Sequence, residues 1–315
     1  MVKSAFTFPG QGSQAVGMAR DLADAFPEAR AVLDEVDEAL GVKLSQIMFE
    51  GPDDTLRLTE NAQPALMASS MAVVRVLKAR GVVLADIASY VAGHSLGEYS
   101  ALCAAGTFSL ADTARLLQIR GRAMQQAVPV GQGAMAAILG LSMDVVREIA
   151  EAASVDEICD VANDNSPGQV VVSGNVGAID RAIALAKEKG AKRALPLPVS
   201  APFHCALMKP AAEAMRDALS TVDMKAPSVP LVANVTARPI TDPEEIRSRL
   251  VEQVTGMVRW TETVQWLAGE GQVEMFYELG TGKVLTGLAK RIDGTLSAQA
   301  IGTPADIEAF LAARG

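Results

Sequence analysis

Histidine is the scarcest chemically useful residue in this chain, because only His94 and His204 occur among its 315 residues. That count excludes a metal centre built from several imidazoles, and it leaves two candidates for a base that works near neutral pH. Cysteine is almost as rare. Cys103, Cys159 and Cys205 are an odd number at long spacings, which fits neither a disulfide framework nor a paired-cysteine metal site. We therefore expect a reduced protein without a metal.

Long hydrophobic runs and an excess of positive charge are also missing. No stretch reaches the roughly 18 apolar residues of a spanning helix, and the first residues lack the pattern of a secretion signal. The 37 acidic residues outnumber the 28 basic ones and give a net charge of −9, which would repel a polyanion. We expect a soluble cytoplasmic protein that binds neither membranes nor nucleic acids.

Half of the residues are hydrophobic, and a length of 315 suggests about two domains. The first part of the chain alternates apolar strands with helices. A strand is expected over 3–8 and another over 87–92, each followed by a glycine-containing turn, and helices are expected over 61–77 and 110–127. Asn61 is the expected cap of the first helix. This order indicates an α/β fold.

Residues 128–199 follow a different pattern and are predicted to be an inserted module. Expected strands and helices occur in the order β-α-β-β-α-β, which is that of a ferredoxin-like unit. Residues 1–127 and 200–315 would then form the catalytic core. Two more core strands are expected over 231–235 and 273–279.

The segment Gly93-His-Ser-Leu-Gly97 matches the G-x-S-x-G motif of a nucleophile elbow. An expected strand precedes it and a helix follows, as the motif requires. Ser95 would stand exposed at a helix start, where backbone N–H groups stabilise an oxyanion. The alternative is a glycine-rich turn whose serine only caps a helix.

A serine nucleophile needs a neighbouring base. His94 adjoins Ser95 on the same turn, so its side chain should point away and pack behind it. His204 follows an expected strand and a loop stiffened by Pro202, which suits a group delivered to a cleft. His204 is therefore the candidate base, while no acidic residue is marked by its spacing as the third member of a triad.

Arg120 indicates what kind of substrate the protein binds. Positions 113, 116, 117, 120 and 124 share one face of the expected helix, and all but Arg120 are apolar or small there. Arg115 and Arg122 fall on the opposite side. A buried guanidinium needs a carboxylate or phosphate partner, so an anionic ligand is one solution. An internal salt bridge, or a stem that reaches water, is the other.

Three further segments have competing interpretations. Gly10-Gln-Gly-Ser-Gln-Ala15 fits a dinucleotide fingerprint, but no second strand ending in an acidic residue follows about 20 positions later. The same loop could present an N–H to an oxyanion. Gly280-Thr-Gly-Lys283 lacks the spacing of a phosphate loop and is predicted to be a turn. Cys205 is expected to pack in the core rather than act as a nucleophile.

Five motifs spaced over nearly the whole chain give a more specific indication. They are Phe8-Pro-Gly-Gln-Gly-Ser-Gln14, Gly93-His-Ser-Leu-Gly-Glu98, Gln118-Ile-Arg-Gly121, Phe203-His-Cys-Ala206 and Leu250-Val-Glu-Gln253. Together they resemble the malonyl-CoA:acyl carrier protein transacylases of bacterial fatty-acid synthesis. The resemblance implies an α/β-hydrolase-like core with a parallel sheet, interrupted by a ferredoxin-like subdomain.

The resemblance also implies roles for individual residues. Ser95 matches the acylated nucleophile and His204 its base, with the backbone amides of Gln11 and Leu96 as the oxyanion hole. The remaining matches are Arg120 for the malonyl carboxylate, Gln63 near the substrate, and Gln253, whose main-chain carbonyl orients the histidine in place of a carboxylate. Phe203 before the histidine resembles the malonyl-preferring pattern.

The implied reaction is a two-step exchange. Ser95 takes the malonyl group from malonyl-CoA, and the phosphopantetheine thiol of acyl carrier protein then removes it. We expect no bound cofactor, and we expect the protein to be a monomer. Because the carrier proteins are acidic, docking would need a local basic patch, for which Lys283, Lys290 and Arg291 are candidates. The alternative for these three is an ordinary solvated helix face.

Three rival functions remain open from the sequence. A serine thioesterase or esterase would share Ser95 and His204 but would have no evident need for Arg120. A nucleotide-dependent oxidoreductase would rest on the loop at Gly10 alone. A non-catalytic acyl-binding protein would keep the pocket but form no ester.

Overall fold

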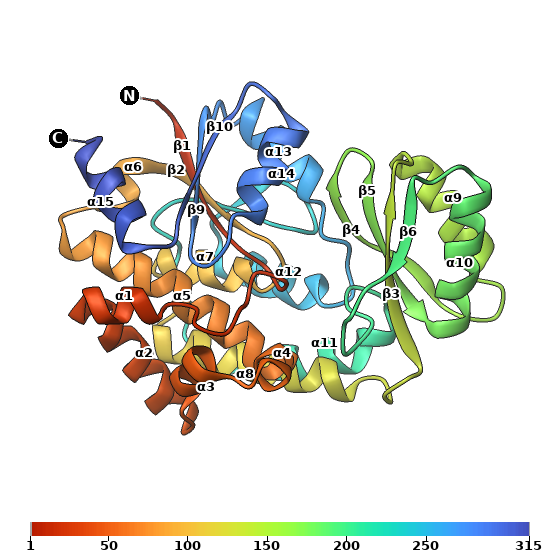
Figure 1. Ribbon diagram of the computed structural model, residues 1–315, viewed down its shortest axis with the longest axis horizontal. Coiled ribbons are helices and arrows are strands. Elements are labelled where there is room, and N and C mark those ends of the chain that lie inside the picture. The colour runs from red at the N-terminus through yellow and green to blue at the C-terminus, as the bar shows by residue number, and fades with distance from the viewer. Residues whose placement is uncertain (1, 315) are drawn as a thin grey trace.

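A computed structural model describes residues 2–314 and has two β-sheets, each with its own helices (Figure 1). The larger sheet carries both ends of the chain, and the smaller sheet, built from the middle of the chain, lies beside it. The fold is thus mixed α/β, as expected. Residues 1 and 315, the outer limits of the expected core, lie outside the described residues.

The larger sheet has six strands in the order β10-β9-β1-β2-β7-β8. All neighbouring pairs are parallel except β7 and β8, which are antiparallel. Its strands are β1 Ser4–Phe8, β2 Ala88–Gly93, β7 Leu231–Val232, β8 Pro239–Ile240, β9 Met275–Leu279 and β10 Ser297–Ile301. The carboxyl ends of β1 and β2 lie next to each other, so the loops that follow them meet at one edge of the sheet.

Helices cover both faces of this sheet, which explains why its central strands are apolar on both sides. In β1, Ala5 packs with residues of α13 and α14, whereas Phe6 and Phe8 pack with residues of α2, α5 and α7. The helices outside the small sheet are α1 Arg20–Ala25, α2 Pro27–Leu40, α3 Leu44–Glu50, α4 Asp53–Arg57, α5 Thr59–Ala79, α6 Leu84–Ile87, α7 Gly97–Ala104, α8 Leu110–Gln126, α11 Lys209–Ser220, α12 Pro243–Gln253, α13 Trp260–Ala268, α14 Val284–Ile292 and α15 Pro304–Ala312, with a short 3₁₀ helix over Ala206–Met208.

The smaller sheet has four antiparallel strands in the order β4-β5-β3-β6. Two helices pack on it and share one separate hydrophobic cluster with its strands. The elements are β3 Gly133–Leu139, α9 Met143–Ala153, β4 Cys159–Ser166, β5 Gln169–Asn175, α10 Val176–Glu188 and β6 Arg193–Pro196. The β-α-β-β-α-β order expected from the sequence is therefore present. Within residues 2–314 no helix has the length and apolar character needed to cross a bilayer.

Two local expectations were wrong. Helix α5 begins at Thr59 rather than after Asn61, because the Asn61 side chain donates to the Thr55 carbonyl oxygen (2.9 Å) instead of capping an amide. Strand β7 ends at Val232 rather than at 235, because Asn234 turns toward the loop after β2. Strands β8 and β10 were not anticipated; β10 is partly exposed and contains small and polar residues.

Candidate active site

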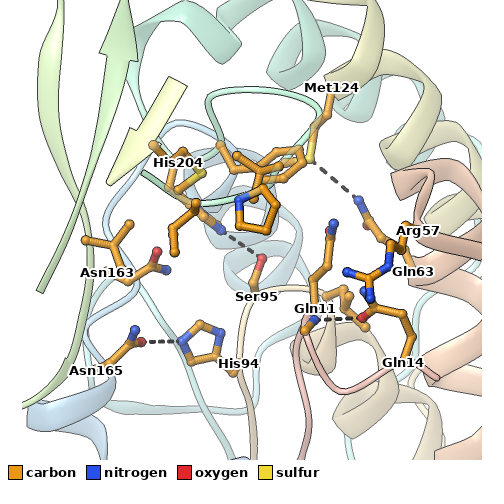
Figure 2. A pocket seen from close by; sticks show the side chains of 18 of the residues that line it. Gln11, Gln14, Arg57, Gln63, His94, Ser95, Met124, Asn163, Asn165 and His204 are labelled. Carbon is orange, nitrogen blue, oxygen red and sulfur yellow. Dashed lines mark hydrogen bonds between the residues drawn. The ribbon is translucent and has the colours of Figure 1, made fainter. Parts of the chain in front are cut away.

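The pocket that contains the candidate residues lies between the two sheets and has a volume of about 280 Å³. Figure 2 shows Ser95 and His204 facing each other in it, with Gln11 and Gln63 on a different side from Asn163 and Asn165. The large-sheet part supplies Gln11, Ser95, Leu96 and residues of α8, and the small sheet supplies Met135, Asn163, Asn165 and Val171. The walls of the pocket are therefore formed by both parts of the fold.

The turn that carries Ser95 is possible only with glycine on both sides. A Cβ on Gly93 would lie 1.9 Å from the Gly97 backbone, and one on Gly97 would lie 2.2 Å from the Phe8 carbonyl oxygen. Ser95 itself has a φ of 54°, a left-handed value that is strained for a serine. Asn234 supports this conformation: its Oδ1 accepts from the Ser95 N–H (2.8 Å), and its Nδ2 donates to the Gly93 carbonyl oxygen (2.7 Å).

The Ser95 hydroxyl meets the imidazole of His204, with Oγ 2.8 Å from Nε2. The other ring nitrogen, Nδ1, lies 2.9 Å from the Gln253 main-chain oxygen and 3.1 Å from that of Gly256. Both of these partners are acceptors, so Nδ1 must carry the ring proton. The lone pair on Nε2 therefore faces the serine and can accept its proton.

His204 is held in its neutral form. Burial and, to a smaller extent, the nearby positive charge of Arg120 lower its pKa to about 3, against the raising effect of the Gln253 carbonyl. Arg120 also donates from Nη2 to Ser95 Oγ (3.1 Å), so the hydroxyl proton is left to point at His204. A serine whose proton faces an unprotonated imidazole is arranged for nucleophilic attack.

Arg120 is 1% exposed and makes no ion pair within residues 2–314. Its Nη1 donates to Gln63 Oε1 (2.7 Å), and its Nη2 donates to Gln253 Oε1 (2.8 Å) as well as to Ser95. Its Nε has no hydrogen-bond partner, and its guanidinium carbon lies 5.6 Å from the centre of the Tyr99 ring. The two alternatives to an anionic ligand, an internal salt bridge of Arg120 and a side chain that reaches water, are therefore both absent among these contacts. A buried cation with only neutral partners suits an anionic ligand.

Gln63 and Gln11 belong to one chain of hydrogen bonds with Arg120. Gln63 Nε2 donates to Thr59 Oγ1 (2.9 Å), and Thr59 Oγ1 donates to Gln11 Oε1 (3.1 Å). Thr59 is fully buried. The loop after β1 is thereby connected to the arginine that lies beside the serine.

The two backbone amides expected to form an oxyanion hole both line the pocket. Leu96 immediately precedes α7, where the helix dipole adds positive potential, and Gln11 lies on the loop after β1. Within residues 2–314 neither N–H donates a hydrogen bond to another protein group. Both are therefore available to an oxygen in the pocket.

His94 turns away from the serine, as expected. Its Nε2 donates to Asn165 Oδ1 (2.8 Å; Figure 2). Its ring lies against that of Trp260, with the ring centroids 5.6 Å apart. All three cysteines are free and buried, and burial raises the pKa of the Cys205 thiol to about 11. Among the described residues no group of three or more His, Cys, Asp or Glu side chains could hold a metal ion.

The three basic residues considered for docking do not line the pocket. Lys283 precedes α14, and Lys290 and Arg291 lie in its last turn. Arg291 donates from Nη1 to Gln169 Oε1 of β5 (2.6 Å), which ties α14 to the small sheet. Gly282, the residue before Lys283, lies beside the loop after β1, because a Cβ on Gly282 would lie 3.0 Å from the Ser13 side chain.

Sequence reasoning missed several members of the site. Asn234, Thr59 and Glu98 are buried and bond to the residues around Ser95. The sequence held a signal for each. Asn234 is a polar residue shortly after an apolar strand, and Thr59 and Glu98 are polar residues in otherwise apolar helical sequence.

Comparison with known proteins gives consistent matches over the whole chain. The profile of the acyl transferase domain family matches residues 5–291. The malonyl CoA-acyl carrier protein transacylase of Escherichia coli (strain K12) is 47% identical over 311 residues, with 99% of each chain covered. The crystal structure of an acyl-carrier-protein-S-malonyltransferase from Bartonella henselae is 58% identical with a TM-score of 0.97, and again 99% of each chain is covered.

A second similar structure includes a partner. It is a malonyl-transacylase in complex with a holo type II PKS acyl-carrier protein, 44% identical to this chain with a TM-score of 0.95 and 99% of each chain covered.

Proposed function

This chain belongs to the malonyl CoA-acyl carrier protein transacylase family, and from that premise and its pocket we propose that it transfers malonyl groups from malonyl-CoA to acyl carrier protein. The observation that carries the proposal is the position of Arg120. Its buried guanidinium, without an anionic partner in residues 2–314, donates to the hydroxyl of the Ser95–His204 pair. A carboxylate on the acyl group supplies the missing charge.

In the first half-reaction Ser95 is the nucleophile and His204 the base. As Oγ attacks the thioester carbonyl, its proton passes to Nε2 of His204, and the oxygen that becomes negative lies against the amides of Gln11 and Leu96. The C–S bond then breaks, and His204 returns the proton to the leaving sulfur of CoA. A malonyl ester on Ser95 remains, with its carboxylate on Arg120.

In the second half-reaction the phosphopantetheine thiol of the carrier protein enters the same pocket. His204 takes the thiol proton at Nε2, the sulfur attacks the ester carbonyl, and Ser95 leaves with the proton that His204 returns. The neutral imidazole supported by the Gln253 and Gly256 carbonyls suits both directions of proton transfer. The residues of this chain need no cofactor for these steps.

The fold also supports a finer description. We propose that residues 1–127 and 200–315 form an α/β-hydrolase-like core and that residues 128–199 form an inserted ferredoxin-like subdomain. The elbow after β2 of a mainly parallel sheet supports the first part. The four antiparallel strands in the order β4-β5-β3-β6 with two helices support the second.

Docking of the carrier protein is proposed to involve Lys283, Lys290 and Arg291. The chain as a whole has a net charge of −9, so an acidic partner needs a local basic surface. The closeness of Gly282, the residue before Lys283, to Ser13 on the loop after β1 supports the proposal for Lys283.

Intact-mass measurement after mixing with malonyl-CoA tests the proposed reaction. We expect the mass of one malonyl group on the wild-type protein, none on Ser95→Ala, and loss of the added mass when a holo carrier protein is supplied. An esterase would release free malonate without a thiol acceptor. A protein that only binds acyl groups would gain no covalent mass, and that result would overturn the proposal.

A charge-reversal pair tests the docking surface. Lys283→Glu should slow transfer to the carrier protein without changing the rate of serine acylation by malonyl-CoA. Lys78→Glu is the control, because it lies 19 residues beyond Thr59 on α5, about 28 Å along the helix axis. Equal effects of the two substitutions would remove Lys283 from the proposal.

A further inference from the structure

Glu98 is a buried carboxyl group that the reaction described above does not use. It lies in the first turn of α7, three residues after Ser95, and is 1% exposed. Its Oε2 accepts a hydrogen bond from Gln253 Nε2, while its Oε1 has no partner within residues 2–314. A buried carboxylate with one unpartnered oxygen is costly, whereas a neutral carboxylic acid in the same place is far less so.

The Gln253 carboxamide lies between Glu98 and Arg120. Its Nε2 donates to Glu98 Oε2 and to the Ser95 main-chain oxygen (2.9 Å), and its Oε1 accepts from Arg120 Nη2 at 2.8 Å. Arg120 therefore reaches Glu98 only through a neutral amide, and the two do not form a direct ion pair. The guanidinium remains open toward the pocket, on the side of Ser95.

The charges in this cluster decide when Arg120 can hold a ligand carboxylate. It is the one buried arginine or lysine in the described chain. An ionised Glu98 would already balance that charge through the amide, and a malonyl carboxylate would then be a second buried anion. Two carboxylates that share one site do not both ionise readily, so one of them must be neutral.

We propose that Glu98 is a positioning residue which must be a neutral carboxylic acid when the malonyl carboxylate occupies Arg120. This inference rests on the proposed function of the pocket. In the neutral form Glu98 still accepts the hydrogen bond from Gln253 and so keeps the carboxamide oxygen directed at Arg120. Ionisation of Glu98 removes the preference for an acyl group that carries a carboxylate.

The surroundings of Glu98 favour this neutral form near physiological pH. Burial raises the pKa of Glu98 to about 8, although the hydrogen bonds from Gln253 and Asn234 and the charge of Arg120 lower it. Burial also raises the pKa of the neighbouring Tyr99, which stays neutral.

Among residues 2–314, no other charged side chain competes for this role. Around α7, strands β1 and β7 carry no charged residue, and β2 carries only Tyr90 as a titratable group. The other charged residues of α5, α8 and α12 are less buried than Glu98, and all but the exposed Lys78 form ion pairs. The pairs are Arg75 with Glu35, Glu60 with Arg122, Asp112 with Arg115, Arg247 with Glu244, and Arg249 with Glu245 and Glu252.

The test compares wild type with Glu98→Gln, which accepts the same hydrogen bond but has no proton to lose. Acylation of Ser95 by limiting malonyl-CoA is followed by rapid quench and intact mass from about pH 6.5 to about pH 9.5. We expect kcat/KM of the wild type, divided by that of Glu98→Gln, to fall about tenfold per pH unit above about pH 8. Dividing by the variant cancels titrations that both proteins share.

Acetyl-CoA is the matched control donor, since its acyl group has no carboxylate and should show no such fall with either protein. If Glu98→Gln does not fold, the ratio of malonyl to acetyl acylation in the wild type carries the same test. A ratio that stays flat over this pH range would overturn the inference. Absence of any malonyl ester at every pH would instead overturn the proposed function.

Discussion

The Nδ1 atom of His204 lies 2.9 Å from the main-chain oxygen of Gln253, the last residue of α12. A main-chain carbonyl takes the place that a carboxylate has in a serine–histidine–acid triad, and it fixes the same ring tautomer without adding a charge. The side chain of the same glutamine serves a different partner, because its Oε1 accepts from Arg120. Gln253 thus positions the base through its backbone and the cation through its side chain.

This division predicts that Gln253→Ala affects substrate choice more than proton transfer. The main-chain oxygen remains in the variant, so His204 keeps its tautomer, but Arg120 loses one of its three partners. We expect malonyl kcat/KM to fall about tenfold to a hundredfold, the effect of one hydrogen bond to a charged group. Acetyl transfer by the same variant should change much less. Equal losses with both donors would mean that the backbone had moved.

Removing the cation itself should have a larger effect. Arg120→Ala should lower malonyl acylation by about 10²–10³-fold, because a desolvated carboxylate is then left without its partner. Acylation by acetyl-CoA should fall less, since of the three hydrogen bonds lost only the one to Ser95 Oγ involves the reacting group. The measurement is kcat/KM for each donor, and equal loss for malonyl-CoA and acetyl-CoA would contradict the assignment.

Arg120→Lys separates charge from geometry. Lysine keeps a positive charge but lacks the fork that now donates to Gln63, Ser95 and Gln253. We expect it to recover part of the malonyl preference and not the full rate. Full recovery would show that charge alone selects the substrate.

The turn around Ser95 gives a prediction about stability. In Gly97→Ala the new Cβ would lie 2.2 Å from the Phe8 carbonyl oxygen, so β1 and α7 must separate. We expect the free energy of unfolding to fall by about 1–3 kcal/mol or more, together with loss of serine acylation. Gly287→Ala on α14 is the control, because a Cβ there would meet no atom within 4 Å apart from its chain neighbours and the backbone of its own helix. That change should stabilise the protein slightly, by about 0.5–1 kcal/mol. Urea denaturation of both variants decides the matter.

Much of the fold was predictable from the sequence, because local patterns set it. The strand and turn before Ser95 and the helix expected over 110–127 follow from apolar runs, glycines and helical spacing. Strand β10 was missed because it is short and, apart from Ile301, contains only small and polar residues, which give a weak hydrophobic signal. The start of α5 was misplaced because the partner of Asn61 is a main-chain oxygen rather than a helix amide.

The candidate site likewise contains features that the local sequence predicts and others that arise only from contacts made on folding. The motif around Ser95 is local, but the 2.8 Å approach of His204 is a contact over 109 residues that no spacing reveals. Residues such as Asn234 and Thr59 matter only through what they touch after folding. Their side chains belong to common types in ordinary strand or helix contexts, so burial and partners had to come from the structure.

Thr59 illustrates such a contact and can be tested. Its hydroxyl accepts from Gln63 and donates to Gln11, so it orients both amides at once. Thr59→Val keeps the shape and loses both bonds. Since a typical hydrogen bond contributes about 1 kcal/mol, we expect malonyl kcat/KM to fall about tenfold or more. Thr59→Ser should restore most of the rate. A lower melting temperature with unchanged kinetics would show a structural role only.

Acid should destabilise the protein through His204. Burial holds its folded pKa at about 3, below the value of 6.5 for an exposed histidine, so the unfolded chain binds more protons between these values. Stability is therefore complete above about pH 6.5 and falls as the pH drops toward the folded pKa. The slope contributed by one such group approaches about 1.4 kcal/mol per pH unit.

His204→Gln isolates this contribution, because the carboxyl groups that also respond to acid remain in both proteins. Urea denaturation at about pH 7 and about pH 5 should show that the wild type loses more free energy of unfolding than the variant, by about 1–2 kcal/mol. His94 retains its own lowered pKa in both proteins and cancels in the difference. If the two proteins lose the same free energy, the imidazole of His204 is not held neutral in the folded state, and the proton could not pass to it from Ser95 in the way described.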